Sequence, residues 1–118
     1  MAIPEFLFYK YRGGFKRIKL NEIFFLEADD NYVNVISLTE KHVIRATFDS
    51  IMSKLPPDKF VRTTRTYAVA IDHIDVFNKE KVTFLGVKDL EIPVGKRYFG
   101  ELKARVKFID GEGKNGEE

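Results

Sequence analysis

The sequence contains no cysteine, and its 118 residues include two histidines. The missing thiols exclude disulfides, thiolate zinc sites and cysteine nucleophiles. Long apolar stretches are also missing, because the longest apolar runs, residues 23–26 and 67–71, are far shorter than the about 18 residues that suggest a membrane span. The first five residues lack the basic-then-apolar order of a signal peptide. We therefore expect a cytoplasmic protein with no membrane partner.

The chain has the size of one domain. Its 118 residues, 44% of them hydrophobic, can bury one core without disulfides or a metal ion. The last nine residues hold four acids, one lysine and no apolar side chain, so we expect residues 1–109 to form the domain and residues 110–118 to be a disordered acidic tail. Without the tail, 19 basic and 14 acidic residues remain. This charge suits a nucleic-acid partner but is common in proteins that bind none.

Short runs rich in β-branched and aromatic residues alternate with turn signals along most of the chain. They predict roughly eight short strands. Arg12-Gly13-Gly14 separates the first two runs and predicts a tight hairpin, because glycine readily takes positive φ. The predicted strands cover residues 6–11, 15–20, 23–27, 32–38, 42–46, 60–62, 67–77 in one or two pieces and 82–85, with a further candidate at 90–94.

Two segments have helical rather than strand periodicity. Residues 48–55 carry apolar side chains at i, i+3, i+4 and i+7, with Thr47 as a candidate cap and Pro56-Pro57 as the end. A second helix is predicted from about Lys96, because apolar residues keep helical spacing as far as Ile109. Without a βαβ rhythm, the sequence predicts a mainly β fold in which antiparallel sheets pack together with two short helices.

The sequence contains few candidate residues for catalysis or metal binding. His42 and His73 lie in strand-like runs without metal-ligand spacing, so we expect structural roles for both. Turn preference explains the adjacent Asp29 and Asp30. The glycines of the first hairpin lack the spacing and following helix of a phosphate-binding loop. We therefore expect no enzyme activity, no cofactor and no metal site.

Polar residues gather in three segments at predicted turns or strand ends. These are residues 29–32 leading into Asn34, residues 62–67, and residues 95–98 at the start of the second predicted helix. Arginine, lysine and asparagine can make directional contacts to base edges, whereas threonine hydroxyls and a helix N-terminus can hold phosphates. On spacing alone, three ordinary solvated turns explain the pattern equally well.

Four blocks of sequence follow one another in a recognisable order. They are residues 23–28 (IFFLEA) with 31–33 (NYV), residues 48–55 as a short central helix, residues 60–69 (FVRTTRTYAV) and residues 92–98 (IPVGKRY). Together they cover about residues 6–108 and resemble LytTR-type DNA-binding domains, the output domains of bacterial response regulators. Each block is short, but the order of all four makes the resemblance specific.

The resemblance implies a transcription regulator of a two-component system, either a stand-alone protein or an output domain whose receiver domain is absent from this chain. It implies loops that enter successive major grooves of double-stranded DNA. It also implies that two copies bind together, as a homodimer, on promoter direct repeats. Arg65 is our first choice for base reading, Lys96 and Arg97 suit phosphate, and Arg62 suits a phosphate or structural role. The implied DNA contacts are Asn31, Tyr32, Asn34, Arg62, Thr64, Arg65, Thr66, Lys96 and Arg97.

The sequence departs from the family pattern at several of these positions. Thr64 replaces a common histidine, Thr66 a serine, Ala70 an asparagine and Gly95 a serine. These changes leave the predicted fold intact and put the DNA target in question. They also keep open an alternative, a protein-interaction module on the same fold without DNA binding.

Overall fold

The computed structural model describes residues 6–114, which form ten strands and two α-helices. The strands are β1 (Phe6–Tyr11), β2 (Gly14–Lys19), β3 (Ile23–Asp29), β4 (Tyr32–Ser37), β5 (Lys41–Arg45), β6 (Phe60–Arg62), β7 (Tyr67–Ala70), β8 (Ile74–Phe77), β9 (Lys81–Phe84) and β10 (Val87–Pro93). The helices are α1 (Phe48–Met52) and α2 (Lys96–Ala104). This mainly β architecture confirms the predicted fold class. The start of the predicted domain, residues 1–5, and the end of the predicted tail, residues 115–118, lie outside the described residues.

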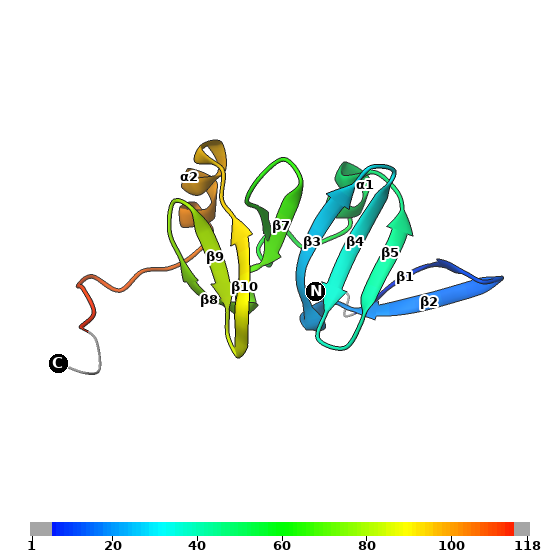
Figure 1. Ribbon diagram of the computed structural model, residues 1–118, viewed down its shortest axis with the longest axis horizontal. Helices are drawn as coiled ribbons and strands as arrows, with labels where there is room; N and C mark the ends of the chain where they lie inside the picture. Colours follow the sequence, from blue (N-terminus) through cyan, green and yellow to red (C-terminus); the bar gives the residue numbers. More distant parts are fainter. Residues whose placement is uncertain (1–5, 115–118) are drawn as a thin grey trace.

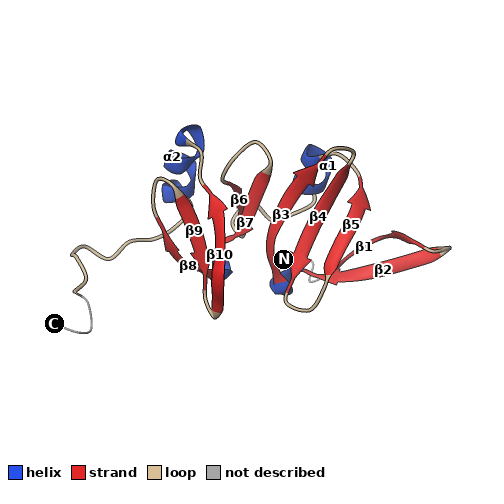
Figure 2. Cartoon of the chain, viewed as in Figure 1, coloured by secondary structure: helices blue, strands red, loops and turns tan. Residues whose placement is uncertain are grey.

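The strands form three antiparallel sheets, arranged along a molecule about 57 Å long (Figures 1 and 2). A central five-stranded sheet has the order β5-β4-β3-β7-β6. A three-stranded sheet, β10-β9-β8, lies with α2 toward one end, and the two-stranded β1-β2 hairpin projects from the other. Within residues 6–114, no helix is long and apolar enough to cross a membrane.

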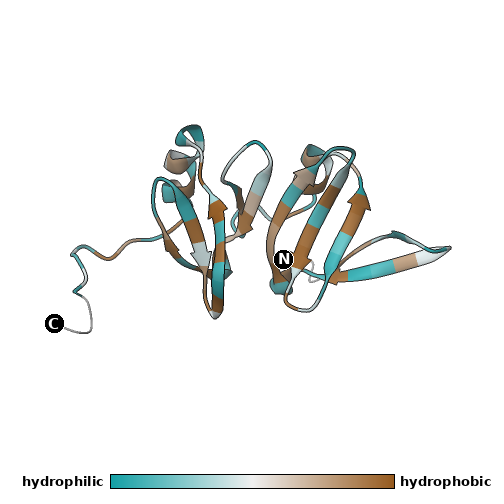
Figure 3. Cartoon of the chain, viewed as in Figure 1, coloured by the Kyte–Doolittle hydropathy of each residue, from teal (hydrophilic) through white to brown (hydrophobic). Residues whose placement is uncertain are grey.

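The central sheet is buried on both faces because its strands alternate apolar side chains in both directions. Leu26, with its partners Val35 and Ala68, belongs to a core shared with the hairpin and α1. Phe25 and Val69 point the other way, into a core shared with the three-stranded sheet and α2. Apolar segments alternate with polar ones on β3, β4 and β5 (Figure 3). The sheet therefore fixes the positions of the loops at its ends.

The first hairpin turns as its glycines predict. Arg12 and Gly13 both have positive φ, at 47° and 80°, and Tyr11 pairs with Gly14 across the turn. Two consecutive positive φ values match the right-handed twist of paired strands, and glycine adopts them without steric cost.

Both helices are shorter than their periodicity predicts. Thr47 caps α1 as expected, since its hydroxyl accepts from the Ser50 amide at 3.1 Å. The helix ends at Met52, and turns follow it before Pro56-Pro57. The predicted continuation of α2 to Ile109 is wrong, because the helix ends at Ala104 and Ile109 is 92% exposed. Without a surface to bury Ile109, helical spacing alone does not extend the helix.

The predicted strand over residues 67–77 divides into two strands that belong to different sheets. β7 lies in the central sheet and β8 in the three-stranded sheet, with a 3-10 turn at Ile71–His73 between them. The turn carries the chain from one layer to the next. The same polypeptide run therefore links the two cores.

Candidate nucleic-acid interface

Three connections lie at one edge of the molecule, at the top of Figure 1. They are the β3–β4 turn (residues 30–31), the β6–β7 loop (63–66) and the β10–α2 connection (94–95), and we call this surface the loop edge. The Gly95 amide donates to the Thr63 carbonyl at 2.6 Å, and the Ala28 amide donates to the Thr66 carbonyl at 2.8 Å. The β6–β7 loop is thus hydrogen-bonded to a neighbour on each side. The structure brings together the three polar segments that are separate in the sequence.

The β6–β7 loop is held by its own threonine. The Thr64 hydroxyl accepts from the amides of Thr66 and Tyr67, at 3.1 and 3.0 Å. The Thr63 amide donates to the Tyr67 carbonyl at 2.9 Å, which closes the base of the loop. Arg65 lies exposed between the threonines and makes no ion pair within residues 6–114. The loop therefore presents one unpaired guanidinium on a locally fixed backbone.

The β10–α2 connection places two further cations on the loop edge. Gly95 is the N-cap of α2 and supplies no side-chain hydrogen bond, so the first amides of the helix are left uncapped by a side chain. Lys96 and Arg97 follow it, both exposed and without an ion pair in the described part of the chain. A Cβ at Gly95 would lie 3.3 Å from a ring carbon of Tyr98, so a side chain at this position would crowd that ring. A helix N-terminus and two cations form a surface that favours phosphate.

The β3–β4 turn carries an aromatic residue supported by an arginine. Asp30 takes a φ of 60° in the two-residue turn, and Tyr32 follows it with 42% of its surface exposed. The Arg45 guanidinium lies over the Tyr32 ring, 5.9 Å from its centroid, because the two residues are paired between β4 and β5. Arg45 was not identified from the sequence. The strand register, rather than any spacing along the chain, is what places it here.

Asn34 does not reach the loop edge, contrary to the predicted DNA contact. It is 3% exposed, and its amide donates to Glu27 at 3.4 Å. The Tyr67 hydroxyl donates to the other oxygen of Glu27 at 3.0 Å. Burial, followed by the Glu27 carboxylate, raises the pKa of Tyr67 above its ordinary value. The three side chains form a row across β4, β3 and β7 that supports the loops from below.

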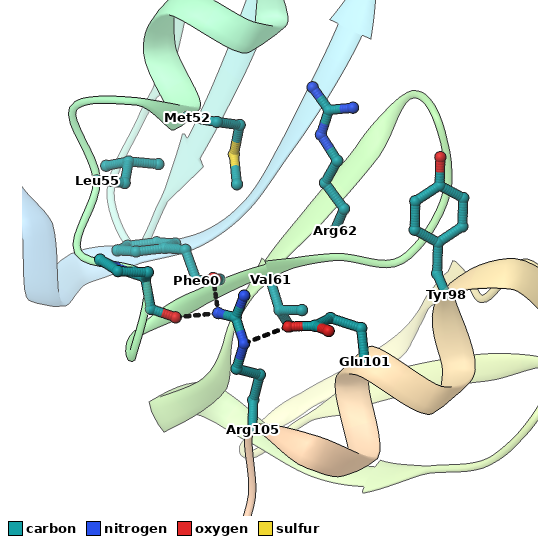
Figure 4. A pocket seen from close by; sticks show the side chains of 9 residues that line it. Met52, Leu55, Phe60, Val61, Arg62, Tyr98, Glu101 and Arg105 are labelled. Atoms are coloured by element: carbon teal, nitrogen blue, oxygen red, sulfur yellow. Dashed lines mark hydrogen bonds and ion pairs between the residues drawn. The ribbon is translucent and has the colours of Figure 1, made fainter.

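Arg62 has partners inside the protein. Its guanidinium forms an ion pair with Asp49 in the first turn of α1 and lies 4.8 Å from the centre of the Phe48 ring. It lines a cavity of about 280 Å³ between the α1 segment and α2 (Figure 4). Arg105 also lines this cavity, where it donates to the Pro57 carbonyl and to Glu101. These contacts favour the structural alternative for Arg62, and Asp49 is a partner that the sequence did not reveal.

Both histidines make contacts within the fold. The Nδ1 atom of His42 lies 3.0 Å from the Tyr9 hydroxyl, and burial lowers the pKa of His42. The Nε2 atom of His73 lies 2.7 Å from the Asn21 carbonyl oxygen. Within residues 6–114, no group of three or more histidine or acidic side chains is arranged to hold a metal ion.

Comparison with known proteins identifies relatives of this fold. The chain matches the family described as LytTr DNA-binding domain over residues 13–107. The transcriptional regulatory protein YpdB of Escherichia coli K12 is 28% identical over 88 residues, 71% of this chain and 36% of that protein. The CO-responsive transcriptional regulator RcoM of Rhodospirillum rubrum is 29% identical over 86 residues, 69% of this chain and 36% of that protein. The chain therefore spans about a third of the length of these curated relatives.

A solved structure has the same fold. The LytTr DNA-binding domain of a methyl-accepting/DNA response regulator from Bacillus cereus superposes with a TM-score of 0.73 at 18% sequence identity. The match covers 89% of this chain and 99% of that domain. The architecture is shared although most residues differ.

Proposed function

The chain belongs to the LytTr DNA-binding domain family, and from this premise we propose that it binds double-stranded DNA sequence-specifically as a bacterial transcription regulator or the output domain of one. One observation carries the proposal. Arg65, Lys96 and Arg97 share the loop edge, exposed and without ion pairs within residues 6–114. Side chains of this kind supply both base readout and phosphate contact.

The cations of the loop edge divide into two roles. Arg65 extends from the centre of a short loop whose backbone is fixed by Thr64, a geometry that suits bidentate contact with a guanine edge. Lys96 and Arg97 begin α2 beside its uncapped amides, a geometry that suits phosphate. Thr66, Asn31 and Tyr32 are exposed nearby and supply flanking contacts. The Thr64 hydroxyl already accepts two backbone amides, so we assign Thr64 to loop geometry rather than to base contact.

The acidic residues at the loop edge favour discrimination between DNA sequences over affinity for DNA of any sequence. Asp29 and Asp30 are exposed at the β3–β4 turn and repel phosphates. Asp49 neutralises Arg62. A surface with few free cations binds random DNA weakly, so base contacts must supply a large part of the binding free energy at a specific site. Pairs of chains on promoter direct repeats would double those contacts.

Two substitutions test the proposed roles. DNA fragments selected from a random pool by the wild-type chain provide the specific site. Arg65→Ala should weaken binding to that site by about 1–3 kcal/mol and relax discrimination at one base pair. Lys96→Ala should weaken binding to all sequences about equally and lower the salt slope by about one unit.

The control is Lys88→Ala, which removes an exposed lysine at the start of β10, at the edge opposite the loops. This variant should match the wild type in both sequence specificity and salt slope within the error of the measurement. Full affinity and specificity in Arg65→Ala would remove Arg65 from the interface. A wild-type chain without salt-dependent DNA binding would favour the alternative, a protein-interaction module.

A further inference from the structure

The β1–β2 hairpin has two faces of different chemistry. Leu7, Tyr9 and Ile18 point from one face into the first core. The opposite face, which we call the outer face, is formed by the side chains that alternate with these along both strands. At each of its cross-strand positions, the outer face pairs one aromatic ring with one cation. The pairs are Phe6 with Lys19, Phe8 with Arg17 and Phe15 with Lys10.

The rings of the outer face are neighbours and are open to solvent. Phe8 is 62% exposed and Phe15 72% exposed. The register makes them diagonal neighbours across the two strands, with Cα atoms about 7–8 Å apart. The Arg17 guanidinium lies 4.6 Å from the centre of the Phe6 ring, within the range of a cation–π contact. Adjacent exposed rings of this kind are typical of a binding surface.

The hairpin is also rich in positive charge. Residues 6–19 include five cations and no aspartate or glutamate. Arg17 and Lys19 line a hollow of about 470 Å³ that also carries Glu22 and Glu40, but neither cation forms an ion pair in the described part of the chain. The outer face therefore offers unpaired positive charge beside its exposed rings, and this charge favours an anionic partner.

A single strand of nucleic acid has the chemistry that matches this face. Its unpaired bases stack on exposed aromatic rings, and its phosphates bind the neighbouring cations. A duplex keeps its bases in their own stack, so it would use only the cations. A membrane would have to bury each ring together with the cation directly across from it, which is costly in hydrocarbon. The outer face has no acid, amide or hydroxyl side chain to contact a 2′-hydroxyl, the group that distinguishes RNA, so we take DNA as the partner.

We propose that the outer face of the hairpin binds a single strand of DNA. Bases stack on Phe8 and Phe15, and phosphates lie against Lys10, Arg17 and Lys19. The hairpin projects from one end of the molecule, whereas the loop edge lies along the top of Figure 1, so the two surfaces are separate. This inference uses no residue of the loop edge and does not depend on the proposed function.

Fluorescence anisotropy with a labelled oligothymidylate of about 12 nucleotides, measured at several salt concentrations, tests the proposal. The wild-type chain should bind it, and the ring variant Phe8→Ala/Phe15→Ala should bind about tenfold or more weakly, because it loses the stacking surface. The lysine variant Lys10→Gln/Lys19→Gln should lower the salt slope by about 1.4 units, since each phosphate contact to a single strand contributes about 0.7. An abasic strand of the same length should bind the wild type about as weakly as oligothymidylate binds the ring variant.

Two control variants separate the hairpin from the rest of the surface. Val76→Ala/Leu85→Ala removes exposed apolar side chains from β8 and the β9–β10 turn, and it should bind oligothymidylate as the wild type does. Arg65→Ala/Lys96→Ala removes two cations from the loop edge and should also leave this binding unchanged. Conversely, the ring and lysine variants should bind the selected duplex site as the wild type does. Failure of duplex binding and failure of single-strand binding are thus distinguishable.

Several results would overturn the proposal. They are a wild-type chain that does not bind oligothymidylate, a ring variant that binds it undiminished, and an abasic strand that binds as tightly as oligothymidylate. Binding to phosphatidylglycerol vesicles without binding to the oligonucleotide would assign the face to a membrane, and an oligouridylate that binds about tenfold or more tightly would assign it to RNA. Circular dichroism shows whether each variant is folded. If the ring variant unfolds, the lysine variant and the abasic strand decide.

Discussion

The hydroxyl of Thr64 should determine both the stability and the precision of the β6–β7 loop. Thr64→Val keeps the β-branched shape and removes the acceptor for the amides of Thr66 and Tyr67. A typical hydrogen bond contributes about 0.5–1.5 kcal/mol net, and loss of a threonine cap costs about 0.5–2 kcal/mol. Thr66 is exposed, so its amide regains water, whereas Tyr67 is half-buried and its amide loses more. We expect the free energy of unfolding to fall by about 1–2 kcal/mol.

Urea unfolding of Thr64→Val beside Thr64→Ser measures this effect. The serine variant keeps the acceptor and should retain most of the stability. With a slope of about 1–3 kcal/mol per molar urea, the midpoint of the valine variant should fall by about 0.3–2 M. Its DNA binding should weaken more at the selected site than on random DNA, because Arg65 loses its fixed backbone. A valine variant as stable and as specific as the serine variant would refute this role for Thr64.

Two further predictions concern the core. Leu102→Ala should lower the free energy of unfolding by about 2–5 kcal/mol, because Leu102 is fully buried where α2 meets the core. The control Lys103→Ala, on the exposed side of α2, should change it by less than about 0.5 kcal/mol in the same urea titration. The stability of the wild type should fall as the pH drops below about 6.5, where the histidine of the unfolded chain binds a proton. In the folded chain, burial lowers the pKa of His42 despite the opposing effect of Glu40. His42 therefore binds its proton only at a lower pH, and the unfolded state is favoured in between. His42→Gln should lose this dependence between pH 7.5 and 5.5, and a slope that persists unchanged would assign it to other groups.

Local chemistry predicted much of the fold. The hairpin follows from Gly13, and the strand positions follow from alternating β-branched and aromatic residues. The sheet to which each strand belongs did not follow, because β7 and β8 have similar composition and a 3-10 turn separates them. Helix ends were also misjudged, since the spacing of apolar residues continues to Ile109 although nothing covers it.

The sequence predicts the exposure of a residue where its own loop carries the signal, and fails to predict it where two elements meet. Arg65 lies in a polar interruption between two strands, so the sequence predicts its exposed position on a loop. Asn34 shares a face with Tyr32, which is exposed at the strand end, and the prediction placed both in solvent. The three-stranded sheet covers that face further along β4, where Ile36 packs in the second core, so Asn34 is buried. Arg45 depends on cross-strand register, which no spacing along the chain expresses.

The charge of the loop edge determines how strongly one copy of the chain can bind DNA of any sequence. Each neutralised phosphate steepens the salt dependence of log affinity by about 0.9, so Arg65, Lys96 and Arg97 give one copy a modest electrostatic affinity. Asp30 and its neighbour reduce it further. Contact between two chains bound at neighbouring half-sites would make the second binding event effectively intramolecular. Occupancy of a paired site would then rise steeply with protein concentration, while isolated half-sites would stay unoccupied.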